Sequence, residues 1–382
     1  MNKLLIVITL FYISTVSVFS NPEIQARSGI LIDYHSGKIL YELDPDLQIY
    51  PASMTKIMTA IVTFDLLKKN KISLDDKYTI SENAWRLSQA GYSSMFIMIN
   101  DQVSVEDLLK GIIIASGNDA CVALAEGIAG SEENFAQMMN EKAGEIGMMS
   151  SNFTNASGIN DPDNISTVRD IALMSAHLIN NYPDFYELFK EKTFTWDRTG
   201  GEPIKQGNRN PLLYKNIGVD GIKTGYLAVE KYSLASTMIK NDRRIIAVAS
   251  GFESKNLRSS QSLKLLNWGF RNTNTFEISK KNETTFEIES WLGIKDKINA
   301  VTKENFYVTI DKKDIKHLNV SLNYNGPIKA PIRKGEKVAE LIIKKKNKNL
   351  KTLPLYASED LKKVNFFKSL ATSLNYLIWG DV

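Results

Sequence analysis

The chain has 382 residues, enough for a large core and an accessory domain, and its composition is that of an ordinary globular protein. Its formal net charge is only +4, which gives no reason to expect nucleic acid as a partner. A single cysteine, Cys121, excludes an internal disulfide and a thiolate metal cluster, and we predict no metal and no cofactor. None of the three histidines lies near a Ser or Cys motif, so nothing points to a Ser-His-Asp or Cys-His mechanism.

The first twenty residues differ from the rest of the chain. Lys3 precedes a mostly apolar, uncharged run from Leu4 to Val18, and small residues lie at Val18 and Ser20 before Asn21. This layout predicts a secretory signal peptide over residues 1–20. The alternative is a membrane anchor, but the run is shorter than the roughly twenty apolar residues that cross a bilayer. We therefore expect cleavage near Ser20 and an exported protein.

The segment after residue 21 mixes strands and helices. Residues 29–32 and 38–41 flank a turn and predict a hairpin with Gly37 at positive φ. Apolar residues at helical spacing predict a buried helix that starts near Ser53. Further helices are predicted over residues 105–129, 132–147, 167–180 and 259–270, and strands over 232–238 and 244–250. Because strands from both ends of the segment bracket the helices, we predict one mixed α/β domain over residues 25–272.

The chain changes character after Asn274. Short runs of alternating apolar residues predict a small all-β domain over residues 275–355. Residues 361–380 then predict an amphipathic helix, whose apolar face comprises Val364, Phe367, Leu370, Ala371, Leu374, Leu377 and Ile378. With lysines beside this face and upstream of it, the helix either packs on its own protein or lies in a membrane interface.

Three short motifs carry candidate chemistry. In Ser53-Met54-Thr55-Lys56 a hydroxyl and an amine lie one helical turn apart on one face. A desolvated ammonium loses proton affinity, so Lys56 can act as the base for Ser53. Ser116-Gly117-Asn118 follows an apolar run, and Lys223-Thr224-Gly225 can place an ammonium, a hydroxyl and backbone groups beside an extended peptide. Each motif alone is weak evidence, because such short patterns also occur by chance or in ordinary turns.

Taken together the motifs are specific. S-x-x-K, S-x-N and K-T-G occur in the order found in class A β-lactamases and penicillin-binding proteins, with Gly117 where Asp is usual. Residues 51–60, 116–120, 155–158, 220–225 and 267–270 resemble low-molecular-mass penicillin-binding proteins with D-Ala-D-Ala carboxypeptidase activity. The resemblance is close before residue 272 and implies a penicilloyl-serine-transferase-like catalytic domain. The all-β domain and the tail fit the same architecture more loosely.

The resemblance implies a role for each motif. Ser53 attacks the carbonyl of the penultimate D-Ala of a peptidoglycan stem pentapeptide, and the terminal D-Ala leaves. Lys56 is the base, Ser116 relays a proton to the leaving amine, and Asn118 hydrogen-bonds the substrate or Lys56. Water then hydrolyses the acyl-enzyme, and β-lactams are expected to acylate Ser53 and stall.

The resemblance also implies how the substrate end is bound. Lys223, Thr224 and Gly225 hold the terminal carboxylate and the peptide beside it. An oxyanion hole is formed by the backbone N–H of Ser53 and one from the strand after Gly225. Arg209 and Arg258 lie where the family carries basic residues, although either can equally be a structural ion pair. Together with the signal peptide, the family favours membrane contact of the last helix and a periplasmic location at the outer face of the cytoplasmic membrane.

The sequence departs from the family beyond the third motif. Leu227 stands where a Thr is usual, and Glu230-Lys231 stands where an Ala-Gly pair is usual, which puts carboxylate recognition and β-lactam affinity in question. Three alternatives stay open: a DD-endopeptidase that cuts cross-links, a peptidoglycan-binding protein with an impaired site, and a class A β-lactamase. The last lacks the E-x-x-x-N element it needs between Asn118 and Lys223.

Overall fold

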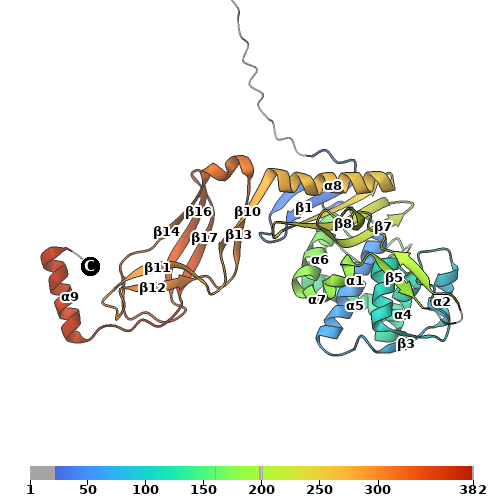
Figure 1. Ribbon diagram of the computed structural model, residues 1–382, viewed down its shortest axis with the longest axis horizontal. Coiled ribbons are helices and arrows are strands. Elements are labelled where there is room, and N and C mark those ends of the chain that lie inside the picture. Colours follow the sequence, from blue (N-terminus) through green and yellow to red (C-terminus); the bar gives the residue numbers. More distant parts are fainter. Residues whose placement is uncertain (1–21, 160, 198, 200, 381–382) are drawn as a thin grey trace, which may run out of the picture.

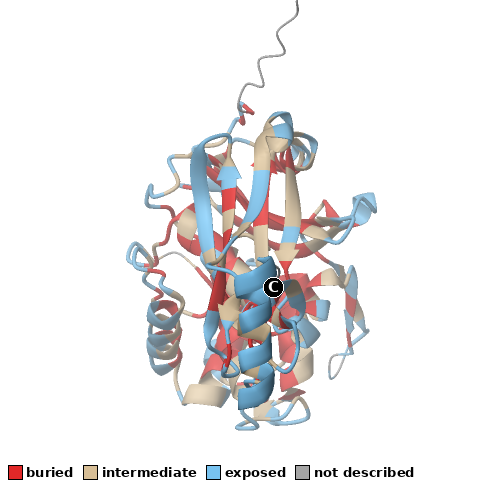
Figure 2. Ribbon diagram, turned by 90° about the vertical axis from the view of Figure 1, so that its left-hand side faces the viewer, coloured by how far each residue is buried: buried red, intermediate tan, exposed pale blue. Residues whose placement is uncertain are grey.

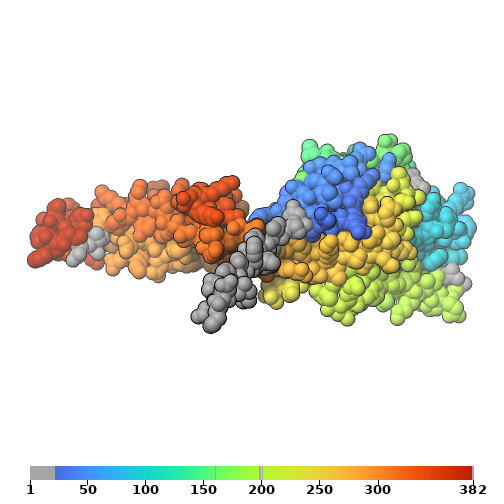
Figure 3. Space-filling view, turned by 90° about the horizontal axis from the view of Figure 1, so that it is seen from above, coloured from blue at the N-terminus to red at the C-terminus, as the bar shows by residue number. Residues whose placement is uncertain are grey.

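The structure is a computed structural model that describes residues 22–159, 161–197, 199 and 201–380, so the predicted signal peptide lies outside the described residues. A broad mixed α/β domain and a narrower β domain succeed one another along the long axis, and the last helix lies at the far end of the β domain (Figures 1 and 3). The predicted fold class is confirmed in both parts.

The centre of the α/β domain is an antiparallel sheet of five strands, ordered β2-β1-β9-β8-β7. Its strands come from both ends of the domain: β1 (Ser28–Asp33), β2 (Ile39–Leu43), β7 (Val219–Leu227), β8 (Lys231–Lys240) and β9 (Arg243–Phe252). The predicted hairpin at Gly37, which has a φ of 67°, joins β1 to β2. Sequence-distant strands thus bring the third motif, on β7, next to the chain that leads to Ser53.

Helices cover both faces of this sheet (Figure 1). Because side chains alternate along a strand, Ile30 and Ile32 of β1 belong to the core beneath the sheet, whereas Leu31 packs on the other face with Leu265 and Leu266. The upper face carries α8 (Lys255–Asn272). The larger core, on the other face, is formed with side chains from α1 (Lys56–Lys68), α4 (Asn118–Ala129), α5 (Glu132–Ile146) and α6 (Val168–Asn181).

Short elements complete this domain. The helices are α2 (Glu82–Gln89), α3 (Val105–Lys110) and α7 (Pro183–Tyr186), and the 3₁₀ turns are η1 (Ala52–Thr55), η3 (Glu187–Lys190) and η4 (Leu213–Lys215). The strand pairs are β3 (Lys77–Thr79) with β4 (Gln102–Ser104), and β5 (Thr193–Trp196) with β6 (Ile204–Gly207). The prediction of one helix over residues 105–129 is wrong. α3 continues into a π-helical turn, η2 (Gly111–Ala115), and the helix is interrupted at Ser116 before α4 begins.

The β domain is built on a six-stranded sheet and a separate pair. The sheet, ordered β14-β16-β17-β12-β11-β15, contains β11 (Thr284–Trp291), β12 (Lys297–Val301), β14 (Leu318–Asn323), β15 (Ile328–Lys329), β16 (Lys337–Lys345) and β17 (Lys348–Ala357). The pair is β10 (Thr273–Ser279) with β13 (Phe306–Asp311), and the 3₁₀ turn η5 (Lys312–His317) comes after it. Its own core includes Ile288, Leu341 and Leu355.

The terminal helix α9 (Phe366–Trp379) starts later than predicted. Leu361 and Lys363 form bridges with Ile332 and Gly293, so residues 361–365 are extended along the β domain. The helix therefore begins at the Asn365 cap, whose side chain accepts a hydrogen bond from the N–H of Lys368. Figure 2 shows this helix in the foreground, largely in the colour of exposed residues.

Candidate active site

The first motif lies where η1 runs into α1. Ala52 has a φ of 49°, an uncommon backbone conformation for a non-glycine residue, and it sets Ser53 at the start of the helix. Lys56 lies one turn later and is 1% exposed. Its Nζ lies 3.2 Å from Ser53 Oγ, 2.6 Å from Asn118 Oδ1 and 2.7 Å from the carbonyl oxygen of Ser157. The amine thus has partners for all of its protons, and one of them is the candidate nucleophile.

The second motif is exposed to the same space by the break between η2 and α4. Ser116 adopts a left-handed conformation with a φ of 63°, a strained state that functional sites often contain. This break turns Ser116 Oγ towards Lys223, whose Nζ donates to it over 2.8 Å. Asn118, at the first position of α4, points to Lys56 instead. The second motif therefore links the two lysines.

The third motif lies on β7, which passes close to the nucleophile. A Cβ added to Gly225 would lie 2.8 Å from the carbonyl oxygen of Pro51, so only glycine permits this approach. Thr224, Gly225 and Leu227 line the same cavity as Ser53. That cavity has a volume of about 820 Å³, within the usual range for small-molecule sites.

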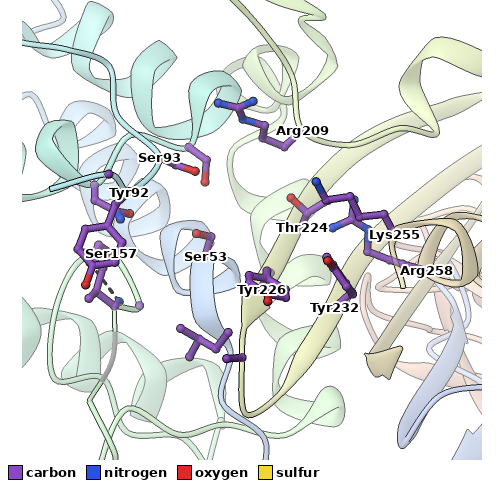
Figure 4. A pocket seen from close by; sticks show the side chains of 18 residues that line it. Ser53, Tyr92, Ser93, Ser157, Arg209, Thr224, Tyr226, Tyr232, Lys255 and Arg258 are labelled. Carbon is purple, nitrogen blue, oxygen red and sulfur yellow. Dashed lines mark hydrogen bonds between the residues drawn. The ribbon is translucent and has the colours of Figure 1, made fainter. Parts of the chain in front are cut away.

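Figure 4 shows how the side chains surround this cavity. Tyr92 and Ser157 lie on one side of Ser53, and Arg209, Thr224 and Arg258 lie on the other. Arg209 Nε donates to the carbonyl oxygen of Ala115 over 3.4 Å. Of the predicted site residues, the cavity is lined by Ser53, Ser116, Asn118, Thr224, Gly225, Arg209 and Arg258. Lys56 and Lys223 do not line it, but they hydrogen-bond Ser53 and Ser116, which do.

Arg258 is the unusual cation of the group. It is only 8% exposed, its guanidinium lies 5.6 Å from the ring centroid of Tyr232, and its Nε has no hydrogen-bond partner among the described residues. No carboxylate of the described residues lies within ion-pair distance of it, so the alternative of a structural ion pair receives no support. Burial lowers its pKa from the ordinary value. An anion that entered the cavity would satisfy this side chain.

Burial also decides the charge state of the two lysines. Desolvation lowers the pKa of Lys56 from the ordinary value of 10.5, although the negative charges of Asp119 and Glu132 oppose the shift. Desolvation holds the pKa of Lys223 well below the ordinary value, and the nearby positive charge of Lys56 adds to the effect. A neutral Lys56 can accept the proton of Ser53, as a general base must.

The structure adds residues for which the sequence offered no motif. Tyr92 and Ser93 come from the loop before Ser94, and Tyr226, Tyr232 and Lys255 complete the opposite rim. The carbonyl of Ser157 contacts Lys56, although the sequence marks residues 155–158 only as a point of resemblance and not as part of the site. No local pattern marks such residues, because only the fold brings them to the cavity.

Comparison with known proteins gives a consistent result. Residues 15–254 match the family described as D-alanyl-D-alanine carboxypeptidase, and residues 274–363 match the C-terminal domain of penicillin-binding protein 5. D-alanyl-D-alanine carboxypeptidase DacC of Escherichia coli (strain K12) is 40% identical over 351 residues, which cover 91% of this chain and 86% of the relative.

Solved structures agree with the sequence relatives. A crystal structure of penicillin binding protein 5 from Haemophilus influenzae aligns with a TM-score of 0.80 and 36% identity, covering 90% of this chain and 99% of that one. Penicillin-binding protein D2 from Listeria monocytogenes, in its ampicillin-bound form, aligns with a TM-score of 0.59 and 27% identity. It covers 66% of this chain and 99% of that one.

Proposed function

Because the chain belongs to the D-alanyl-D-alanine carboxypeptidase family and is a serine hydrolase, we propose that Ser53 is its nucleophile and Lys56 the base for acylation. The observation that carries this proposal is the buried amine of Lys56, 3.2 Å from Ser53 Oγ. Burial lowers the pKa of that amine, so the neutral form needed for proton transfer is accessible.

The proposed reaction uses each of these positions. The proton of Ser53 Oγ passes to Lys56 Nζ as the oxygen attacks the carbonyl carbon of the penultimate D-Ala of a stem pentapeptide. The resulting oxyanion is stabilised by the backbone N–H of Ser53 and one from the strand after Gly225. When the C–N bond breaks, the leaving nitrogen of the terminal D-Ala takes up, by way of Ser116 Oγ, the proton that Lys56 accepted, and Lys56 becomes neutral again. Lys223 Nζ holds Ser116 Oγ in place through a hydrogen bond of 2.8 Å. Water then hydrolyses the ester on Ser53.

The substrate's terminal carboxylate would enter a cationic end of the cavity. Arg209, Arg258 and Thr224 line that end, and Lys223 lies near enough to both arginines for their charges to act on it. The arrival of an anion would raise the pKa of Lys223 again and so recruit a proton to bind it. The side chain of Leu227 lines the same cavity, but it has no hydrogen-bond donor to offer the carboxylate.

A single experiment tests the nucleophile. After incubation with penicillin, mass spectrometry of the intact protein should show one covalent adduct, mapped to Ser53 by peptide analysis. Ser53→Ala should show neither the adduct nor release of D-Ala from a pentapeptide. An adduct on another residue would refute the assignment. Rapid penicillin turnover by the wild type would instead support the β-lactamase alternative, and cleavage of cross-linked dimers in preference to pentapeptide would support the endopeptidase.

We also propose that the protein is exported and contacts the membrane through α9. No helix among residues 22–159, 161–197 and 201–380 is long and apolar enough to cross a bilayer. In α9, Tyr376 packs against Trp291 of the β domain, with ring centroids 5.2 Å apart. The opposite, apolar side of the helix faces outward, so that Leu377 is 79% exposed. Such an apolar surface suits a membrane interface.

The membrane proposal has a matched pair of variants on one helix. Leu377→Asp places a charge on the outward apolar face, whereas Asn375→Asp makes a charge change at an exposed polar position two residues away. Leu377→Asp should abolish co-sedimentation with anionic phospholipid vesicles, and Asn375→Asp should weaken it only slightly. Equal binding by both variants would show that the apolar face does not contact lipid.

A further inference from the structure

A buried carboxylate outside the motifs contacts the chain that leads to Ser53. Glu230 lies in the connection between β7 and β8, and its side chain is fully buried. Its Oε2 accepts a hydrogen bond from the backbone N–H of Tyr50 over 3.1 Å and forms an ion pair with Arg27. Its Oε1 accepts from Ser250 Oγ over 2.6 Å. Three separate segments therefore meet at one carboxylate.

The Tyr50 contact matters because Tyr50 lies three residues before Ser53 in the chain. Pro51, which has no N–H, and Ala52, with its positive φ, come between the two. On one side Gly225 of β7 lies against Pro51, and on the other Gly158 lies so close to Ala52 that an added Cβ would overlap the Ala52 carbonyl oxygen, at 1.9 Å. The strained turn is thus confined on two sides, and the Tyr50 N–H gives it a third fixed point.

We propose that Glu230 is a positioning residue that holds the nucleophilic turn against the substrate-binding strand. It does so from the position where the family usually carries a small residue, and through a hydrogen bond rather than by contact with substrate. The inference rests on the proposed role of Ser53. Since Glu230 belongs to the connection that continues β7, the same carboxylate sets both the strand with Lys223 and the segment before Ser53.

Two conservative variants separate this role from a merely structural one. Glu230→Gln keeps the length of the side chain and an oxygen that can accept from the Tyr50 N–H, but it loses the charge that Arg27 requires. Glu230→Asp keeps the charge but withdraws the carboxylate by one methylene group. If Glu230 positions Ser53, the acylation rate constant at saturating penicillin should fall about tenfold in Glu230→Asp and stay within about threefold of wild type in Glu230→Gln. The penicillin concentration for half-maximal rate should change little in either.

A structural ion pair with Arg27 predicts the reverse order, with Glu230→Gln the more damaged variant. Asp33→Asn is the matched control, because Asp33 is also a fully buried carboxylate paired with an arginine, but it lies on β1, which β9 and β8 separate from the strand of the third motif. It should lower the melting temperature without changing acylation. Glu230→Met, which removes the acceptor at similar volume, provides a second variant should Glu230→Asp fail to fold.

The outcomes are distinct. Wild-type acylation in Glu230→Asp, or in Glu230→Met, would overturn the positioning role. Slower acylation in Glu230→Gln than in Glu230→Asp would overturn it as well. A wild-type protein that forms no adduct on Ser53 would instead refute the proposed function on which the inference rests.

Discussion

At the scale of single residues, the charge state of Lys56 controls the proposed chemistry. Burial is the main cause of its lowered pKa, and it is opposed by the nearby carboxylates Asp119 and Glu132. A lysine in water is almost fully protonated at neutral pH and cannot serve as a base. The spacing of Ser53 and Lys56 in the sequence suggested that the two side chains meet, and the structure shows that the amine is also buried away from water.

This charge state predicts a pH dependence. Only the neutral amine of Lys56 accepts the proton, so the acylation rate should rise with pH and level off at a pH below lysine's ordinary pKa of 10.5. Lys56→Arg, whose guanidinium stays charged, should lower the rate about 10²–10⁴-fold and remove the rising limb. Stopped-flow acylation by a chromogenic β-lactam between pH 6 and 10 measures both. If the acylation rate of Lys56→Arg still rises with pH, a titrating group other than Lys56 causes the rise.

Replacement of Leu227 by a residue with a hydroxyl is expected to strengthen substrate binding rather than weaken it. Leu227 lines the cavity on the strand that carries Lys223 and Thr224, at the position where the family usually has a hydroxyl. Leu227→Thr should therefore add a donor for the substrate carboxylate and lower KM for a D-Ala-D-Ala peptide about three- to tenfold, with kcat little changed. Steady-state D-Ala release gives both constants. Leu227→Val, which removes bulk without adding a hydroxyl, is the control, and an equal effect there would point to space rather than hydrogen bonding.

The sequence was sufficient for the motif residues because local chemistry marks them. Ser53 and Lys56 lie one helical turn apart whatever the tertiary structure, and this pair could be predicted. The Ser116–Lys223 contact joins residues from a helix break and a strand, and only the family resemblance suggested it. Tyr92 had no detectable signal, and Ser157 and Glu230 were marked only as a match to the family and a departure from it. Their contacts could not be predicted, because each depends on a backbone or cavity position that only the fold creates.

At the scale of elements, the break between η2 and α4 is the feature that periodicity missed. The apolar run at Ile112–Ala115 continues a helical pattern, so the sequence predicted one helix to residue 129. In the structure a π-helical turn and the left-handed Ser116 interrupt it, which frees Ser116 and Asn118 to face the cavity. The spacing of apolar residues indicates only which side chains are buried, and residues 112–116 are buried although the helix is interrupted there. The pattern therefore gives no sign of it.

Asp119 stabilises this break from the first turn of α4. Its carboxylate accepts hydrogen bonds from Ser94 Oγ at 2.6 Å and from the N–H groups of Met95 and Phe96, both at 2.8 Å. It thereby fixes the loop that carries Tyr92 and Ser93. Because an amide oxygen cannot replace two carboxylate oxygens, Asp119→Asn should lower the free energy of unfolding by about 1.5–3 kcal/mol. Urea denaturation measures this loss. An unchanged midpoint would mean that the loop is held by other contacts.

At the scale of the whole molecule, the two domains join through a small polar junction. Asp33 of β1 accepts hydrogen bonds from Arg243 at 2.8 Å and from Thr275 of the β domain at 2.5 Å. Arg243 in turn donates to the carbonyl oxygen of Thr273, and Ser36 Oγ lies 2.6 Å from Thr309 Oγ1. With the cavity in one domain and α9 at the far end of the other, this junction sets how the cavity is oriented relative to α9, the helix that we propose contacts a membrane (Figure 1).

The junction predicts a specific sensitivity to acid. Burial alone would raise the pKa of Asp33, but hydrogen bonds from Thr275, the Ser36 backbone and Arg243 outweigh it and hold the pKa below the ordinary value of 3.8. A carboxylate whose pKa is lowered by folding stabilises the protein above its unfolded pKa and loses this effect as the pH falls through its folded pKa. Asp33→Asn should therefore cost about 3–5 kcal/mol near pH 7.

The cost of Asp33→Asn should shrink as the pH falls from the unfolded pKa near 3.8 towards the lower folded pKa, because the wild-type carboxyl is protonated first in the unfolded and then in the folded state. Urea unfolding of both proteins at pH 7, 5 and 3 measures the difference. Asp314, on η5 in the β domain, is the matched control, since it pairs with Lys345 but makes no contact across the junction. Asp314→Asn should cost well under 1 kcal/mol, as surface pairs do. A pH-independent difference for Asp33→Asn would show that its charge, and with it the ion pair to Arg243, does not stabilise the junction.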